Sequence, residues 1–343
     1  MLARVHIQLP YALTVPKDEQ YNVYAYEKDG YVVRVYMPEA SERSNIYNEA
    51  DSVTIDGKEA FQVDVLRIDY QKDEFDRKKA DIQKDEFISD PPKDFIKDTA
   101  NDFLARLRYV TGGGQIKLLQ FPSINWNLQY LNDDGSELPE EKGYIRGLGG
   151  RKIEYSFIIL NKEVWDDVHL LEPFHPTPVW KTLLLDAEAV LPEIGPAIIL
   201  TFTALEVFIS IILNELDKTG KIETPLWDWI NKRDFYLKEP SNEDKFGFLS
   251  EYLIGKSIKS DIKLWESFIE LRKARNSFAH NGIAIVNGTE VTLIKAREFI
   301  MKAKEIIKFI KEQLPEELLW PEFEHNVQLG VTQKIIEQKA DDK

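Results

Sequence analysis

Two charged residues lie where the hydrophobic pattern predicts buried positions. The segment 197–213, AIILTFTALEVFISIIL, is apolar almost all round, which predicts a helix in the middle of a bundle, and Glu206 is its one charged residue. A second helix is predicted over 260–280, where Arg275 takes a core-facing place. The other members of that apolar stripe are Leu264, Phe268, Leu271 and Phe278. Since a buried carboxylate needs a partner, we expect Arg275 to point towards Glu206, in either a structural ion pair or a functional site.

A histidine near the end of the second helix bears on the choice between a structural ion pair and a functional site. His280 follows Arg275 by five residues, which is about 140° round an ideal α-helix, but Asn281-Gly282 predicts the helix end there and the last turn can loosen or tighten. The helix dipole favours an imidazolium at a C-terminus, which suits a general acid near neutral pH. A lone histidine at this place is also a common helix cap.

The residues around this histidine resemble a known signature. Residues 271–282, LRKARNSFAHNG, resemble the HEPN family, in which an Arg, a polar residue, three further residues and a His end a long penultimate helix. The matching members are Arg275, Asn276 and His280. The apolar helix with its embedded Glu, FTALEVFISII, also resembles the family, especially its Apea-like branch. The resemblance covers roughly residues 180–315, less than half of the chain.

The resemblance implies a reaction. Many HEPN proteins are metal-independent endoribonucleases, in which the 2′-OH of RNA attacks the adjacent phosphate and leaves a 2′,3′-cyclic phosphate and a 5′-OH. Arg275 would stabilise the phosphorane charge and His280 would transfer protons, while Asn276 would donate a further hydrogen bond or orient the imidazole ring. Glu206 would hold Arg275 in its productive rotamer or would only satisfy a buried cation.

The resemblance also implies partners. Such enzymes act as homodimers, and Arg272 and Lys273 are candidate RNA contacts beside the site. We expect a toxin or anti-phage effector that cleaves a short exposed RNA loop, such as a tRNA loop, under the control of an antitoxin or trigger protein. We expect no metal and no cofactor. The alternative is a non-catalytic HEPN module that dimerises or binds a nucleotide or a protein.

Composition limits the ways in which the chain could bind RNA. The 343 residues include 44 Lys and Arg against 59 Asp and Glu, a net charge of −15, and −10 of it lies in residues 1–177. This balance argues against an extended phosphate-backbone binder and favours a brief encounter with a short loop. The absence of cysteine excludes disulfides, thiolate metal sites and a cysteine nucleophile.

The elements that must position these residues indicate a two-domain α+β protein. Residues 1–176 read as a β-rich domain of unknown role, a possible sensor or RNA-positioning module, with hairpin turns at Asp29-Gly30 and Asp56-Gly57. Residues 177–320 read as a HEPN-like helical bundle and 321–343 as a polar tail. The predicted helices of the bundle are 178–191, 195–217, 224–236, 243–254, 260–280 and 294–314.

Other features are predicted from local patterns. A helix follows Pro91-Pro92, and later strands are expected at 117–120, 125–131 and 152–160. The charged stretch 71–98, which contains QKDEF twice, predicts an exposed rim or loop. The apolar segment 197–213 is shorter than the ~20 residues that span a bilayer and carries a Glu, so we expect a cytoplasmic protein without a membrane partner.

Overall fold

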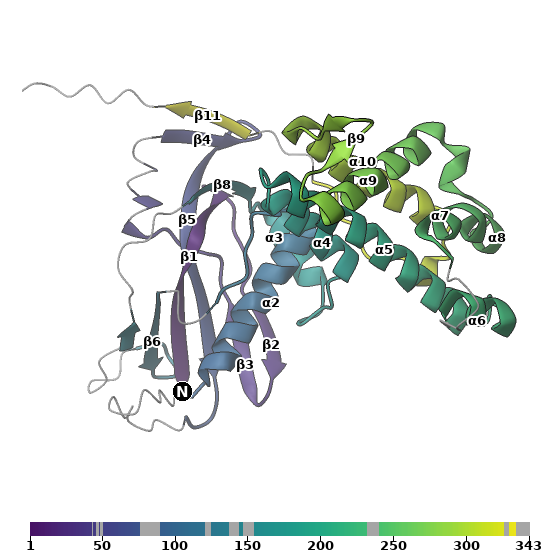
Figure 1. The fold of residues 1–343 in the computed structure, drawn as a ribbon. Coiled ribbons are helices and arrows are strands. Elements are labelled where there is room, and N and C mark those ends of the chain that lie inside the picture. Colours follow the sequence, from purple (N-terminus) through teal and green to yellow (C-terminus); the bar gives the residue numbers. More distant parts are fainter. Residues whose placement is uncertain are drawn as a thin grey trace, which may run out of the picture. The chain divides into compact units, whose positions relative to one another are not determined.

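The chain forms two compact units. The computed structural model describes residues 1–42, 44–45, 48, 51–75, 90–120, 125–136, 144–146, 154–231, 240–325 and 329–333. The sheet unit comprises Met1–Pro176 together with Phe323–Lys343, and the helical unit comprises Thr177–Glu322. The predicted α+β organisation, a β-rich region followed by a helical one, is confirmed (Figure 1).

One mixed sheet organises the sheet unit. Its strand order is β11-β4-β5-β1-β6-β7, with β3 on β5, β2 on β3, and β8 parallel to β1. The central strand, β1, pairs antiparallel with β5 along most of its length, with a register shift between Gln8 and Leu13. The described strands are β1 (Leu2–Pro16), β2 (Tyr24–Lys28), β3 (Tyr31–Val35), β4 (Asp51–Ile55), β5 (Lys58–Gln71), β6 (Trp126–Leu131), β7 (Tyr144–Arg146), β8 (Glu154–Ile159) and β11 (Leu329–Gln333).

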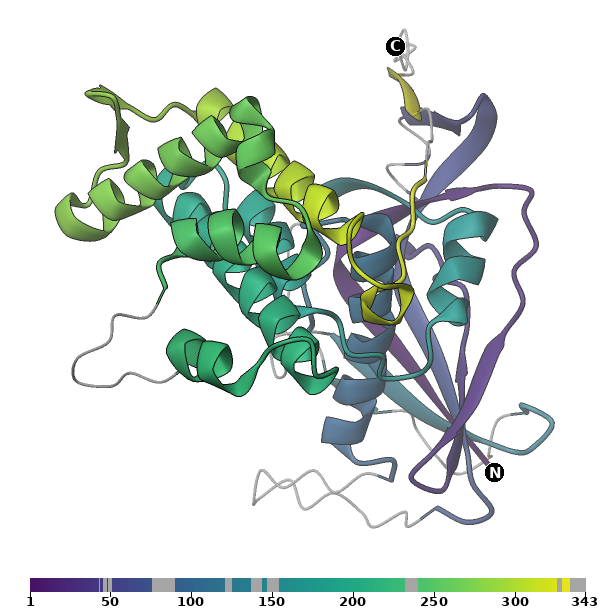
Figure 2. The same ribbon diagram turned by 90° about the vertical axis from the view of Figure 1, so that its right-hand side faces the viewer.

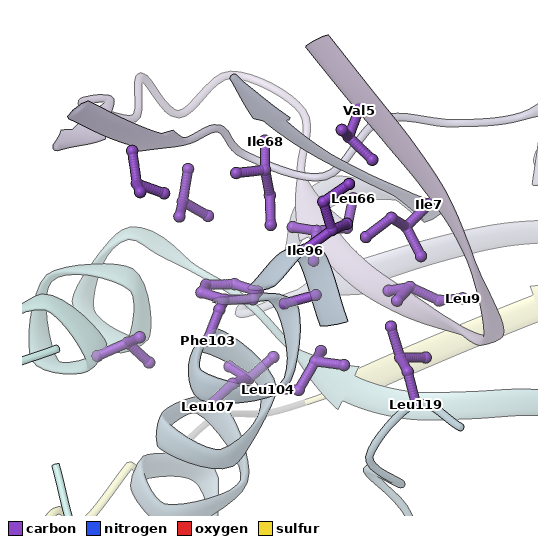
Figure 3. Packing of buried hydrophobic residues seen from close by; sticks show 14 of the residues in the cluster. Val5, Ile7, Leu9, Leu66, Ile68, Ile96, Phe103, Leu104, Leu107 and Leu119 are labelled. Atoms are coloured by element: carbon purple, nitrogen blue, oxygen red, sulfur yellow. The ribbon is translucent and has the colours of Figure 1, made fainter. Parts of the chain in front are cut away.

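Helix α2 (Lys93–Thr111) packs on one face of this sheet. Alternate residues of the central strands point to that face, where Val5, Ile7 and Ile68 lie opposite Phe103 and Leu104 of the helix (Figure 3). All five side chains are fully buried. The helix that was predicted after the proline pair therefore supplies the helical half of this core.

Three features of the sheet unit differ from the prediction. Residues 117–120 form no strand, because the Asn101 side chain bonds both the N–H and the C=O of Leu119, at 2.6 and 3.0 Å, in place of a neighbouring strand. In the charged stretch, Phe75 is buried, and residues 76–89, with the second QKDEF, lie outside the described residues. Helix α3 (Lys162–Leu170) was not predicted; Asn161 caps its N-terminus.

A buried ion pair ties α2 to the end of α3. Arg106, 1% exposed, donates through Nε and Nη2 to Asp102 and through Nη1 to the carbonyl of Val168 at 3.0 Å. Asp102 also accepts the backbone N–H of Phe174 at 2.6 Å, and Phe174 has a positive φ of 60°. Burial and the nearby Arg106 lower the pKa of His169 to about 3, so its imidazole is neutral at physiological pH.

The helical unit follows its predicted elements closely. Its helices are α4 (Val179–Ala189), α5 (Ile194–Lys218), α6 (Thr224–Asn231), α7 (Asn242–Asp244), α8 (Ser250–Ile254), α9 (Ile262–Asn281) and α10 (Leu293–Lys311). The helix expected at 243–254 contains a π-helical turn, Lys245–Leu249, between α7 and α8. Residues 232–236 of the helix expected at 224–236 lie outside the described residues. A short hairpin, β9 (Ile285–Val286) and β10 (Thr289–Glu290), joins α9 to α10.

Helix α5 forms the centre of the helical unit. It packs against α4, α9 and α10 (Figures 1 and 2). Among the described helices it alone is long and apolar enough to cross a membrane, and 56% of its most apolar window is buried within the protein. Packing on three neighbouring helices therefore accounts for its apolar character.

The chain returns to the sheet unit after the helical unit. The prediction of a polar tail from residue 321 is therefore wrong for the described part of that segment. Phe323 packs on Tyr109, His325 is largely buried beside Glu163 and Asp167 of α3, and β11 pairs antiparallel with β4. The physical reason lies in β4. Its side away from β5 would be an edge with free backbone N–H and C=O groups, and such an edge can pair with a further strand.

Candidate functional site

Helix α9 carries most of the predicted site. Asp261 caps its N-terminus by accepting from the N–H groups of residues 263 and 264, and Gly282, with φ of 73°, ends it. The predicted apolar stripe is shifted at one place. Ala274 is fully buried, whereas Arg275 is only partly buried.

Arg275 lies against α5, though not in the predicted ion pair. Its guanidinium carbon is 5.7 Å from the centroid of the Phe202 ring, a cation–π contact. Nη1 donates to the side-chain oxygen of Asn276 at 3.1 Å. The Nε–H of Arg275 is buried and has no hydrogen-bond partner among the described residues.

Glu206 has a different partner from the expected one. It is partly buried, one turn after Phe202 on α5, and accepts a hydrogen bond from Asn242 Nδ2 at 2.7 Å. In the described part of the chain Glu206 and Arg275 form no ion pair, so the predicted contact between them is wrong. The first residue of α7 supplies the donor, and sequence spacing carried no signal for this long-range contact.

Arg272 resembles Arg275 in having an Nε–H group without a partner in the described part of the chain, but it also forms an ion pair. It forms an ion pair with Glu243 of α7, and both side chains are about one-third exposed. Its Nε–H is also buried without a partner among the described residues. Residues three apart are neighbours on a helix surface, so Arg272 and Arg275, each with a buried and unpartnered Nε–H, follow each other along one side of α9.

The remaining predicted residues are exposed. Lys273, Asn276 and His280 all lie on the outer surface of α9. The helix stays regular through His280, since Gly282 donates to the carbonyl of Phe278 at 2.8 Å after it. The last turn therefore does not bring His280 round to Arg275, and the two remain about 140° apart.

This arrangement determines what the site can do. A buried donor without a partner costs about 1–3 kcal/mol, and an anion that accepts from both arginines would remove that cost. His280 is accessible for proton transfer, whereas Arg275 belongs to a different side of the same helix. One copy of α9 therefore carries two arginines with donors that are unpartnered among the described residues on one side and an imidazole on another. In the described part of the chain, no group of three or more His, Asp or Glu side chains is placed to hold a metal ion.

Two contacts of the site were missed from the sequence. Asn242 and Glu243, at the start of α7, contact Glu206 and Arg272 respectively. A helix was expected at 243–254, and the structure contains a full capping box at Ser241–Asp244, but neither feature says which helix lies opposite. Comparisons of the chain with known protein families, with curated proteins and with solved structures found no match.

Proposed function

We propose that the helical unit is a HEPN-type domain and that the protein is a metal-independent endoribonuclease. Three features support the family: the very apolar α5, the Arg275–Asn276–His280 pattern at the end of α9, and a single long helix, α10, after it. The observation that carries the activity is the pair of arginines with buried, unpartnered Nε–H groups. The planar guanidinium of arginine matches the oxygens of a phosphodiester in geometry and charge.

The reaction follows from RNA's own nucleophile. The 2′-OH attacks the neighbouring phosphorus, the bond to the 5′-oxygen breaks, and the products are a 2′,3′-cyclic phosphate and a 5′-OH. Arg275 stabilises the charge that develops on the phosphate oxygens, with Arg272 beside it. His280 moves a proton to the leaving oxygen or from the attacking one. Asn276, which accepts from Arg275, holds the guanidinium, and Lys273 adds charge at the exposed rim.

A homodimer resolves the separation of these groups. Arg275 and His280 lie about 140° apart on one helix, so a single copy does not place both on one phosphate. A second copy of α9 across a two-fold axis would bring the His280 of one copy towards the Arg275 of the other. The net charge of −15 favours a short exposed loop, such as a tRNA loop, as the substrate. A toxin or anti-phage role, with an antitoxin or trigger protein, fits such an activity.

Cleavage assays with two variants test the proposal. Purified wild-type protein should cut RNA in the presence of EDTA and leave 5′-OH ends that polynucleotide kinase can label. Arg275→Ala and His280→Ala should each lower the rate by about 10²–10⁴-fold. Lys263→Ala is the matched control, because Lys263 is an exposed cation at the other end of α9. Cleavage that EDTA abolishes, or that both variants retain, would contradict the proposal.

A non-catalytic HEPN module that binds a nucleotide or protein, or only dimerises, is the second candidate. One observation favours it: no hydrogen bond or ion pair within the described residues orients the His280 ring, whereas catalytic histidines are held by a neighbour. This alternative predicts that wild-type protein cuts no RNA. It also predicts that Arg275→Ala lowers the melting temperature while His280→Ala leaves it unchanged.

A further inference from the structure

The helix beside the arginine pair carries two exposed aromatic side chains. Phe248 is 65% exposed and Tyr252 is 76% exposed, and their spacing of four residues puts them on one side of the segment 242–254. The π-helical turn Lys245–Leu249 lies at this place, and such turns are rare and frequent at functional sites. Water-exposed rings at such a turn need an explanation beyond packing.

These rings border a pocket of about 380 Å³. Its lining residues are Leu226, Asp244, Phe248, Leu249 and Tyr252. The Nζ of Lys259 lies 3.8 Å from the centroid of the Phe248 ring and fixes it by a cation–π contact. Gly247 permits this approach, because a Cβ there would lie 2.8 Å from Cε of Lys259.

One polar group of the pocket has spare hydrogen-bonding capacity. The Oδ2 atom of Asp244 accepts from the backbone N–H and the hydroxyl of Ser241, at 2.9 and 2.7 Å. Its Oδ1 atom has no partner among the described residues. The pocket thus combines exposed rings, a cation behind one ring, and a single acceptor, which is the set of groups that recognises an unstacked base.

The first turn of α7 connects the pocket to the arginine pair, because Asp244 lines the pocket and its neighbour Glu243 contacts Arg272. Glu243, the residue before Asp244, pairs with Arg272, and Asn242 bonds Glu206 on α5. A nucleotide whose phosphate lies on Arg272 and Arg275 would therefore have its base near the first turn of α7. An apolar protein segment would leave both the arginines and the Asp244 oxygen unused, whereas a nucleotide offers phosphate oxygens to the arginines and base N–H groups to the carboxylate.

We propose that this pocket holds one unstacked base of a single-stranded RNA substrate, stacked on Phe248 and Tyr252 and hydrogen-bonded through a base N–H to Oδ1 of Asp244. The inference rests on the proposed function, because it concerns the RNA that is cleaved at the arginine site. It assigns base recognition to the α7–α8 segment and phosphate recognition to α9. A base with N–H donors on its Watson–Crick edge, such as guanine, fits the Asp244 acceptor.

Binding measurements with an uncleavable RNA test the pocket. A short single-stranded 2′-O-methyl RNA has no 2′-OH nucleophile, so the full-length wild-type protein can be titrated by fluorescence anisotropy. Phe248→Ala and Tyr252→Ala should each weaken binding by about tenfold, the usual loss for one stacked base. Asp244→Asn should weaken guanine-containing RNA more than the same RNA with inosine, which lacks the exocyclic amino group. Met301→Ala, an exposed apolar residue of α10, is the control.

The outcomes separate the pocket from the reaction. If both aromatic variants fold natively by circular dichroism and bind the RNA with unchanged affinity, the proposal is overturned. If, in addition, these variants change the self-association of the protein, a second copy of the chain is the occupant of the pocket. The proposal would also be overturned if guanosine monophosphate displaced the labelled RNA as well as unlabelled RNA does, because a free nucleotide would then be the ligand. Affinity that depends on both rings would support the pocket even if the wild type cut no RNA.

Discussion

Arginines with buried N–H groups occur in two different states in this molecule. Arg106 in the sheet unit is 1% exposed and directs its guanidinium to Asp102 and to the carbonyl of Val168. Arg272 and Arg275 in the helical unit each keep a buried Nε–H without a partner among the described residues. A satisfied guanidinium supports the fold, whereas a buried donor without a partner carries a free-energy cost that a ligand could remove. This difference assigns a structural role to Arg106, and it is the observation behind the ligand-binding role that we propose for the pair on α9.

Replacing Arg106 should therefore cost stability. Arg106→Met leaves the Asp102 carboxylate buried without its cation, and we expect the free energy of unfolding of the sheet unit to fall by about 3–5 kcal/mol. Urea titration followed by circular dichroism would measure it. Lys162→Met is the matched control, since Lys162 and Asp166 form an ion pair with the same spacing on α3 but are about half exposed. The control should lose less than about 1 kcal/mol. Equal losses would contradict the structural role of Arg106.

At the scale of elements, α9 and α5 come especially close at one point. Gly195, in the first turn of α5, lies so near Phe278 that a Cβ on it would be 2.0 Å from Cε2 of the ring. The glycine lets the last turn of α9, which carries His280, approach α5. The crossing fixes where the site residues lie although neither Gly195 nor Phe278 belongs to the site.

Gly195→Ala should disturb this crossing. The new methyl group overpacks the interface, and we expect a loss of about 1–3 kcal/mol in the free energy of unfolding. The double variant Gly195→Ala/Phe278→Ala should cost less than the sum of the two single variants, because removing the ring makes room for the methyl group. Denaturant unfolding of the four proteins measures this coupling. Additive losses would show that the two residues do not meet.

At the scale of the whole molecule, the helical unit is inserted into the sheet unit. The chain leaves the sheet unit after Pro176 and returns to it at Phe323. Phe323 and His325 then contact Tyr109 and α3, and β11 completes the sheet on β4. Part of the sheet unit is therefore made only after the whole helical unit has been synthesised.

Removing the last segment should loosen the sheet unit alone. A chain that ends at Glu322 lacks β11 and the contacts of His325, so amide hydrogens of β4 and α3 should exchange at least about tenfold faster, while those of α5 and α9 stay protected. Hydrogen–deuterium exchange with mass spectrometry measures this. A chain that ends at Gln333 keeps β11 and is the control. Unchanged exchange in β4 would contradict the assignment of β11 to the sheet.

Local physical chemistry made much of this fold predictable. Asp29-Gly30 and Asp56-Gly57 indicated hairpins because those pairs tolerate positive φ, and both turns have it. Proline pairs, caps and apolar periodicity located most helices to within a few residues, and the Arg275–Asn276–His280 pattern selected the end of α9. These signals are carried by residues close together in the chain, so the sequence contains them directly.

Only the tertiary structure decided the contacts between distant residues. The apolar pattern gave Arg275 a core position, but packing against α5 buries Ala274 and leaves the arginine partly exposed. Glu206 bonds Asn242, 36 residues away, and not Arg275. The return of β11 to β4 joins strands across the entire helical unit. Such pairings depend on which surfaces meet after folding, and neither periodicity nor capping encodes that choice.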